Sequence, residues 1–186
     1  MGFCLFNNVA LAAHHARTTF HLQRILLVDW DVHHGNGTQD IFWSDPAVAF
    51  FSMHRYGHGF YPGSGAADET GAGPGLGFTT NVPVRLGISR SEYLALFRTT
   101  LETVADHIKP ELIILSAGFD AHRLDPIGAL GLEAEDFAEM TKNVRAVADM
   151  HAQGRLVSCL EGGYHPQALA ESVQAHLEVL LHPSSQ

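Results

Sequence analysis

Short apolar runs recur along the chain at intervals that suit buried strands. Four of them, RILLV (24–28), VAFFSM (48–53), ELIILSAG (111–118) and RLVSCL (155–160), are mostly apolar, and TTNVPV (79–84) is a less regular fifth. A strand that alternates apolar and polar residues covers one face only, whereas a nearly continuous apolar run is buried on both faces. These runs therefore predict a parallel sheet that is covered on both sides.

The segments between these runs carry apolar residues at helical spacing. An alanine-rich helix is expected from a cap at Asn7 to about Thr19, and Pro166 suits the first turn of a closing helix. Two longer helices lie between them, the first behind a capping-box pattern at Ser89 and Glu92. Their apolar positions are Tyr93, Phe97, Leu101, Val104 and Ile108, then Phe137, Met140, Val144, Val147 and Ala148. Strands that alternate with helices in this way predict an α/β fold, a three-layer parallel sheet with helices on both faces.

Chemically capable side chains follow three of the strands where each strand ends. Asp29, Asp31 and His33 come after the first run, in the stretch VDWDVHHGNG. Asp120 follows the run ELIILSAG, in the stretch SAGFDAH, and Tyr164 follows the run RLVSCL, in the stretch LEGGYH. Open α/β sheets bind ligands beyond the carboxyl ends of their strands, so these segments are expected to converge on one crevice.

Asp31, His33 and Asp120 form a set of oxygen, nitrogen and oxygen ligands. Three protein ligands that leave one coordination position open are the pattern of catalytic zinc sites. The alternative is a hydrogen-bonded network at the strand ends, and the coincidence of all three residues favours the metal. Gly35 and Gly37 follow in the sequence, and we expect them to take positive φ in a tight turn beside the site.

Tyr164 lies on a Gly-Gly turn, where its phenol would face the same crevice. A bound metal polarises a carbonyl and lowers the pKa of water, as hydrolysis of an unactivated amide requires. A hydroxyl placed opposite would donate to the oxyanion that forms when water attacks. The alternative for Tyr164 is an ordinary buried tyrosine with a satisfied hydroxyl. These residues together predict a metal-dependent amide hydrolase.

The composition sets limits on partners and compartment. The 186 residues are 46% hydrophobic, enough for a single domain over 1–186, and the formal charge of −9 argues against direct nucleic-acid binding while fitting a cationic partner. Two cysteines give no disulfide framework, and there is no signal peptide or apolar run long enough to span a membrane. We expect a soluble cytoplasmic protein with no membrane partner, or a nuclear one in a eukaryote.

The chain contains 13 histidines, and most of them are expected to lie outside the site. His14 and His15 fall inside the first helix, where adjacent positions do not share a face, so we expect both on the helix surface. His34 should point away from the side that carries the ligands. Three more are expected at the rim of the crevice without an assigned role, namely His54, His58 and His122.

Five stretches of the sequence resemble the zinc-dependent histone deacetylase family, particularly its class II members and their bacterial relatives. They are GFCLFNNVALAA, VDWDVHHGNGTQ, FFSMHRYGHGFYPGSG, SAGFDAHRLDP and LEGGY, in the order of the family and over nearly the whole chain. The resemblance implies the arginase/deacetylase fold and a Zn²⁺ ion, or another divalent metal, held by Asp31, His33 and Asp120. It also implies that Tyr164 is the transition-state tyrosine.

The same resemblance implies two further groups of site residues. A monovalent cation, usually K⁺, would be held by side chains or carbonyls of Asp29, Asp31, His33, Ser52 and Met53. A narrow tunnel for an acylated lysine side chain would be flanked by Phe3 and Tyr61, with Ile127 at its rim and Gly163 at its floor. From the residues alone, Phe3 and Tyr61 are equally typical of ordinary core or loop aromatics.

The resemblance departs from the family at the start of the chain. Family members carry a Gly-His-His segment shortly before the GFCLFNN motif, and this sequence begins at Met1, immediately before that motif. We therefore expect an incomplete domain that lacks its first strands and its general-base histidine pair. Asp29 and Asn36, which would support that pair, are present. Residues 1–186 alone are expected to show little activity and to expose a sheet edge through which another copy could bind.

Three functions stay open at this point. The first is hydrolysis of acetyl-lysine amides in a protein or peptide, the second is deacetylation of acetylpolyamines on the same fold, and the third is a non-catalytic metal-binding fragment. Polyamine deacetylases of this family carry an acidic residue where this chain has Ile127. An aliphatic rim does not attract a second ammonium group, which favours acyl-lysine in a peptide.

Overall fold

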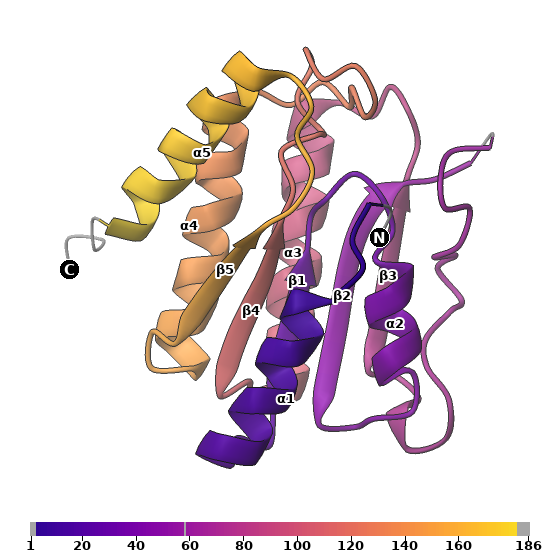
Figure 1. Cartoon of the computed structure of the whole chain (residues 1–186), viewed down its shortest axis with the longest axis vertical. Coiled ribbons are helices and arrows are strands. Elements are labelled where there is room, and N and C mark those ends of the chain that lie inside the picture. Colours follow the sequence, from indigo (N-terminus) through magenta and orange to yellow (C-terminus); the bar gives the residue numbers. More distant parts are fainter. Residues whose placement is uncertain (1–2, 58, 182–186) are drawn as a thin grey trace.

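A five-stranded parallel sheet with the strand order β3-β2-β1-β4-β5 forms the centre of the protein (Figure 1). The computed structural model describes residues 3–57 and 59–181, so that His58 lies outside the described residues. The strands are β1 (Ile25–Asp29), β2 (Val48–Arg55), β3 (Thr79–Val84), β4 (Leu112–Ala117) and β5 (Leu156–Leu160). Every neighbouring pair is parallel, as the apolar runs predicted, so all five carboxyl ends lie at the same edge of the sheet.

Helices cover both faces of this sheet, which makes the three-layer architecture expected from the sequence (Figure 1). The helices are α1 (Asn8–Phe20), α2 (Asn36–Phe42), α3 (Arg90–Ile108), α4 (Ala134–His151) and α5 (Pro166–Leu181). Asn7 caps α1 by accepting a hydrogen bond from the Ala10 N–H, and Ser89 caps α3 through the Glu92 N–H. Within the described parts of the chain, none of the helices is long and apolar enough to cross a membrane.

Two apolar cores form because alternate residues of each strand point to opposite faces. On one face, Leu26, Val28 and Trp30 pack with the apolar sides of α3 and α4. On the other face, Ile25 and Leu27 pack beneath α1 and against Phe42 of α2. The central strands β1 and β4 are therefore buried along their whole length. This burial makes the sheet a rigid base for the residues at its carboxyl edge.

Strand β5 is the outer strand beside β4 and is less covered than the central strands. Val157 is 45% exposed and Leu160 is 62% exposed, although both are apolar. Within the described residues β5 pairs with β4 alone, so one row of its backbone groups is unpaired. The run RLVSCL is therefore a strand, as predicted, but it is a half-exposed one.

Helix α2 was not expected from the sequence. Gly35 precedes its first turn with φ −75°, and Gly37 lies within it, so the prediction of positive φ at these two positions was wrong. Gly35 is required for space instead: a Cβ atom there would overlap Asp29 Oδ2 and lie 2.9 Å from the ring of Phe50. The chain therefore enters a helix directly after the VDWDVHH stretch.

Candidate active site

The carboxyl ends of three adjacent strands hold the candidate ligands. Asp31 and His33 follow β1, Asp120 follows β4, and the segment of Gly162 to Tyr164 follows β5. These strands are neighbours in the sheet, in the order β1-β4-β5, so residues about 130 positions apart in the sequence come into contact. Tertiary structure thus brings the predicted segments to one place.

The three ligand residues present one atom each to a common point. His33 Nδ1 lies 3.0 Å from Asp31 Oδ1 and 3.2 Å from Asp120 Oδ2. Ligand atoms of these three residues all lie within 4.8 Å of one another. Two ligands of a tetrahedral zinc ion at ordinary bond lengths are about 3.4 Å apart. The set is therefore compact enough for one ion.

Backbone amides hold the carboxylates in place. Asp31 accepts hydrogen bonds from the His33 N–H (2.8 Å) and the Gly162 N–H (2.9 Å). Asp120 Oδ1 accepts one from the Val32 N–H at 2.8 Å, while its buried Oδ2 has no hydrogen bond within the described structure. Asp29 Oδ1 accepts from the Asp31 N–H, and its buried Oδ2 likewise has none. Asp29 Oδ2 therefore has no donor, and the close polar neighbour of Asp120 Oδ2 is His33 Nδ1 of the same ligand set at 3.2 Å, an arrangement that fits a site for cations.

The electrostatics point to the same conclusion. Burial, and then repulsion from Asp31, raise the pKa of Asp29 and of Asp120 above the usual range of aspartate. Burial alone would lower the pKa of His33, but the carboxylates of Asp120 and Asp31 outweigh it and raise that pKa to about 9. An excess of buried negative charge is relieved when a divalent cation binds. The residues present therefore fit a metal ion.

Two glycines let β5 approach these ligands. A Cβ atom on Gly162 would overlap Asp120 Oδ2 and lie 2.7 Å from Asp31 Oδ2. Gly163 has φ +144°, a conformation that residues with side chains rarely adopt, and this turn presents Tyr164 to the site. The Gly-Gly pair therefore has a steric role in addition to the turn that the sequence suggested.

A cavity of about 540 Å³ opens beside the ligands. Its lining includes Phe3, Tyr61 and Ile127, together with Asp31, His33 and Tyr164; Gly162 also lines it, whereas Gly163 does not. The sequence interpretation did not single out the other lining residues, Cys4, Leu160 and Glu161. They were missed because an exposed strand end and a lone cysteine carry no pattern of their own.

Aromatic rings form one wall of the site. Phe60 stacks on the His33 ring with 5.0 Å between the centroids and 8° between the planes, and Tyr61 meets the same imidazole edge-on at 6.2 Å. Phe3 lies edge-on to Tyr164 at 6.3 Å across the cavity. Phe60 was missed from the sequence because an aromatic residue in a glycine-rich loop has no periodicity to reveal its partner.

Tyr164 is placed to act as a neutral hydrogen-bond donor. Its side chain is 37% exposed and lines the cavity next to the ligands. Burial, followed by repulsion from Asp120 and Asp31, raises the pKa of its phenol to about 12. The hydroxyl therefore keeps its proton at neutral pH.

The other histidines in residues 3–57 and 59–181 do not line the cavity. His14 and His15 are exposed on α1, as expected. His34 points away from the ligands and bonds to Ser64 Oγ and Gln39 Oε1. The rim placement of two others was wrong, because both are buried in polar networks: His54 between Ser52 and the Gly65 carbonyl, His122 beside the Leu124 N–H and Glu133. Each satisfies local backbone groups instead of facing a substrate.

Comparison with known proteins places this constellation in a family. The histone deacetylase domain matches residues 1–180. The chain belongs to the histone deacetylase family. The chain is 47% identical to human "Polyamine deacetylase HDAC10" over 184 residues, 97% of this chain and 27% of that protein. It is 46% identical to "Histone deacetylase 5" of Arabidopsis thaliana, over 97% of this chain and 28% of that protein.

A solved structure supports the same assignment for the fold. The crystal structure of the HDA15 HD domain superimposes with a TM-score of 0.90 and 40% sequence identity. The match covers 98% of this chain and 52% of that one. This member of the histone deacetylase family thus spans about half the length of the solved chain and about a quarter of the length of the curated relatives. Its parallel sheet with helices on both faces is the arginase/deacetylase-like fold.

Proposed function

We propose that this protein hydrolyses acylated amines, with acetyl-lysine in a protein or peptide as the substrate. The observation that carries the proposal is the compact set of Asp31, His33 and Asp120, of which Asp31 and His33 line a largely apolar cavity. These three residues would hold Zn²⁺ or another divalent ion. When bound, such an ion supplies Lewis acidity toward a carbonyl group and toward water.

The residues of the cavity suit each part of such a substrate. The apolar side chains of Phe3, Tyr61 and Ile127 would pack along the aliphatic stem of a lysine. Tyr164 would donate its phenolic hydrogen to the acyl oxygen as negative charge develops there. Among the cavity-lining residues that the structure describes, the charged groups other than His33 are acidic, which favours binding of a substrate that carries a cationic amine.

The proton transfer step separates the proposed function from its alternative. In the described part of the chain, His33 is the one imidazole that lines the cavity, and its Nδ1 faces the carboxylates of the ligand set. A positioned base typically contributes 10² to 10⁴-fold to such a reaction. We therefore expect residues 1–186 to bind the metal ion but to turn over substrate slowly. A metal-binding unit without activity is the second candidate function. The observation in its favour is that the described cavity lining holds no imidazole besides His33.

A monovalent cation belongs to the same proposal. Asp29 and Ser52 are paired across β1 and β2, and Met53 follows Ser52 in the strand. Asp29 Oδ2 is buried without a hydrogen-bond donor in the described structure. We propose that K⁺ binds here through Asp29, Asp31, His33, Ser52 and Met53, and compensates the carboxylate charge behind the divalent site.

The test compares wild type with Asp120→Ala, using both metal content and acetate release. The purified chain, loaded with Zn²⁺, is assayed on an acetyl-lysine peptide and on an acetylated polyamine, and its metal content is measured by elemental analysis. We expect one divalent ion per wild-type chain, loss of that ion in the variant, and faster turnover of the peptide. Equal metal content in both proteins would refute the ligand assignment, and faster turnover of the polyamine would refute the substrate.

A further inference from the structure

Asp125 is a buried carboxylate that lies outside the ligand set and bonds to two walls of the cavity. It belongs to the loop between β4 and α4, and its side chain is almost completely buried. Asp125 Oδ1 accepts hydrogen bonds from the backbone N–H groups of Ile127 (2.9 Å) and Gly128 (3.0 Å). Asp125 Oδ2 accepts one from the backbone N–H of Tyr164 at 2.7 Å. One side chain therefore joins the loop that carries Ile127 to the backbone that carries Tyr164.

The bond to Tyr164 acts where the backbone needs support. Tyr164 follows Gly163, which has a φ of +144°. Glycine is conformationally permissive, so this residue alone does not fix the direction of the chain that follows it. Hydrogen bonds from backbone amides to an ionised carboxylate are shorter and stronger than those between neutral groups. The Asp125 bond therefore fixes the direction in which the chain leaves the turn, and with it the position of the phenol over the cavity.

We propose that Asp125 is a positioning residue, which holds Tyr164 and the Ile127 side of the cavity in one fixed relation. The proposal rests on the proposed function in so far as Tyr164 donates to the substrate. Asp125 does not line the cavity itself, so it acts on the reaction through these two neighbours. A carboxylate in this role keeps the distance between the Ile127 side of the cavity and the phenol of Tyr164 constant.

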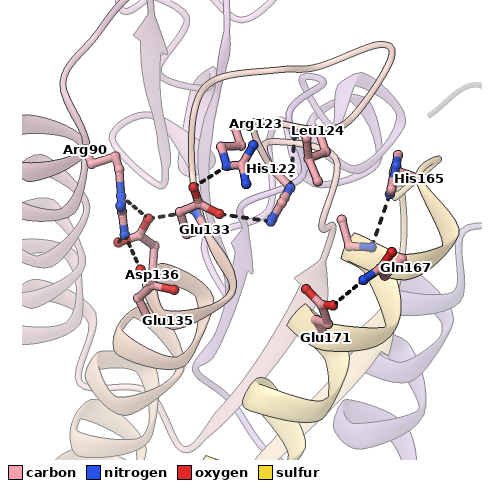
Figure 2. Close-up of polar contacts among 11 residues, drawn as sticks. Arg90, His122, Arg123, Leu124, Glu133, Glu135, Asp136, His165, Gln167 and Glu171 are labelled. Atoms are coloured by element: carbon pink, nitrogen blue, oxygen red, sulfur yellow. Dashed lines mark hydrogen bonds and ion pairs between the residues drawn. The ribbon is translucent and has the colours of Figure 1, made fainter.

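The loop that carries Asp125 is anchored independently on both sides. Arg55 Nη1 donates to the Gly128 carbonyl at 3.2 Å, and its guanidinium lies 4.3 Å from the ring centre of Phe60, which stacks on His33. At the far end, Figure 2 shows Glu133 between Arg123 and His122. With these anchors present, loss of Asp125 is expected to release Tyr164 without unfolding the loop.

Glu111 provides a matched control at the opposite edge of the sheet. Its Oε2 accepts hydrogen bonds from the N–H groups of Gln23 (2.7 Å) and Arg24 (3.0 Å), so it also joins distant backbone segments through a carboxylate. It precedes β4, whereas the cavity lies beyond the carboxyl end of that strand. Glu111→Gln therefore removes the same kind of interaction at a distance from the site.

The experiment measures amide hydrogen exchange by NMR in wild type, Asp125→Asn and Glu111→Gln. Asn keeps one acceptor oxygen for Ile127 and Gly128 and places an NH₂ group against the Tyr164 N–H. In Asp125→Asn we expect the ratio of the exchange rate of the Tyr164 amide to that of the core amides of β4 to rise at least tenfold. In Glu111→Gln we expect this ratio to stay unchanged. If Asp125→Asn does not fold, Asp125→Ser, which adds no second donor against Tyr164, takes its place.

Turnover gives the second readout. In Asp125→Asn we expect kcat for an acetyl-lysine peptide to fall about tenfold, with KM and metal content unchanged, because Tyr164 acts on the developing charge. An unchanged exchange rate of the Tyr164 amide, or an equal increase in exchange rate at all amides, would overturn the positioning role. If wild type has no turnover, the proposed function fails and the exchange ratio alone decides the role of Asp125.

Discussion

One buried histidine on α5, His176, is expected to contribute to a loss of stability between pH 7 and pH 5. His176 Nδ1 lies 2.7 Å from Thr141 Oγ1, whose own hydrogen is donated to the Phe137 carbonyl. His176 must therefore donate from Nδ1 to Thr141, and its Nε2 accepts from Ser158 Oγ at 2.9 Å. The ring is neutral in this arrangement, and it connects α5 to both α4 and β5.

The sign and size follow from the pKa of this imidazole. Burial lowers the pKa of His176 to about 4, whereas an unfolded histidine titrates near 6.5. The unfolded chain therefore binds the extra proton first, so stability is complete above pH 6.5, declines as the pH falls and levels off below pH 4. Between pH 7 and pH 5 the difference corresponds to roughly 2 kcal/mol in the free energy of unfolding.

Urea unfolding of wild type and His176→Gln at the two pH values measures this contribution. Glutamine does not titrate, so the loss of unfolding free energy between pH 7 and pH 5 should be smaller in the variant by roughly 2 kcal/mol, with equal m-values. His14→Gln, on the exposed surface of α1, is the control and should behave like wild type. If His176→Gln loses as much stability in acid as wild type, the assignment of a buried neutral imidazole is wrong. The result bears on function because α5 begins two residues after Tyr164.

Three further predictions concern the site. Tyr164→Phe should lower kcat by about a hundredfold or more without a change in metal content, as loss of an oxyanion donor typically does; a near-normal kcat would remove Tyr164 from the mechanism. Ile127→Glu should shift the preference from acetyl-lysine peptide toward acetylpolyamine, and competition assays with both substrates would detect no shift if the rim is irrelevant. Gly162→Ala should weaken divalent-ion binding about tenfold or more in calorimetric titration, because its Cβ would overlap Asp120 Oδ2. Gly37→Ala, with free space around its Cβ, is the control, and equal weakening in both would contradict the steric argument.

Local patterns in the sequence were sufficient for most of the elements. The runs that became β1, β2 and β4 are buried on both faces, and a nearly continuous apolar run has few other interpretations. Helix α2 escaped prediction because it is short, contains one glycine and directly follows another. Its position depends on space beside Asp29 and Phe50, which no local pattern records.

The hydrogen-bond networks around His54 and His122 show most clearly what could not be predicted from the sequence. His54 and His122 have the composition of site residues, but their ring nitrogens bond to Ser52 and Gly65, and to the backbone of Leu124. Ser52 lies in the same strand as His54 and Leu124 in the same loop as His122, but Gly65 lies in the loop after β2, 11 residues from His54. These contacts therefore depend on how that loop folds back over the sheet. Burial of a histidine is thus decided by the packing around it and not by its neighbours in the sequence.

The sequence by itself determined which residues have the chemistry for this site and at which strand ends they lie. Asp31, His33, Asp120 and Tyr164 each follow an apolar run, and parallel strands bring their carboxyl ends to one edge. Only the tertiary structure decided the distances among these groups and the contacts that hold them, including the bond from the Tyr164 amide to Asp125. The physical reason is that periodicity is a local property of the chain, whereas hydrogen bonds between loops depend on the packing of the whole sheet.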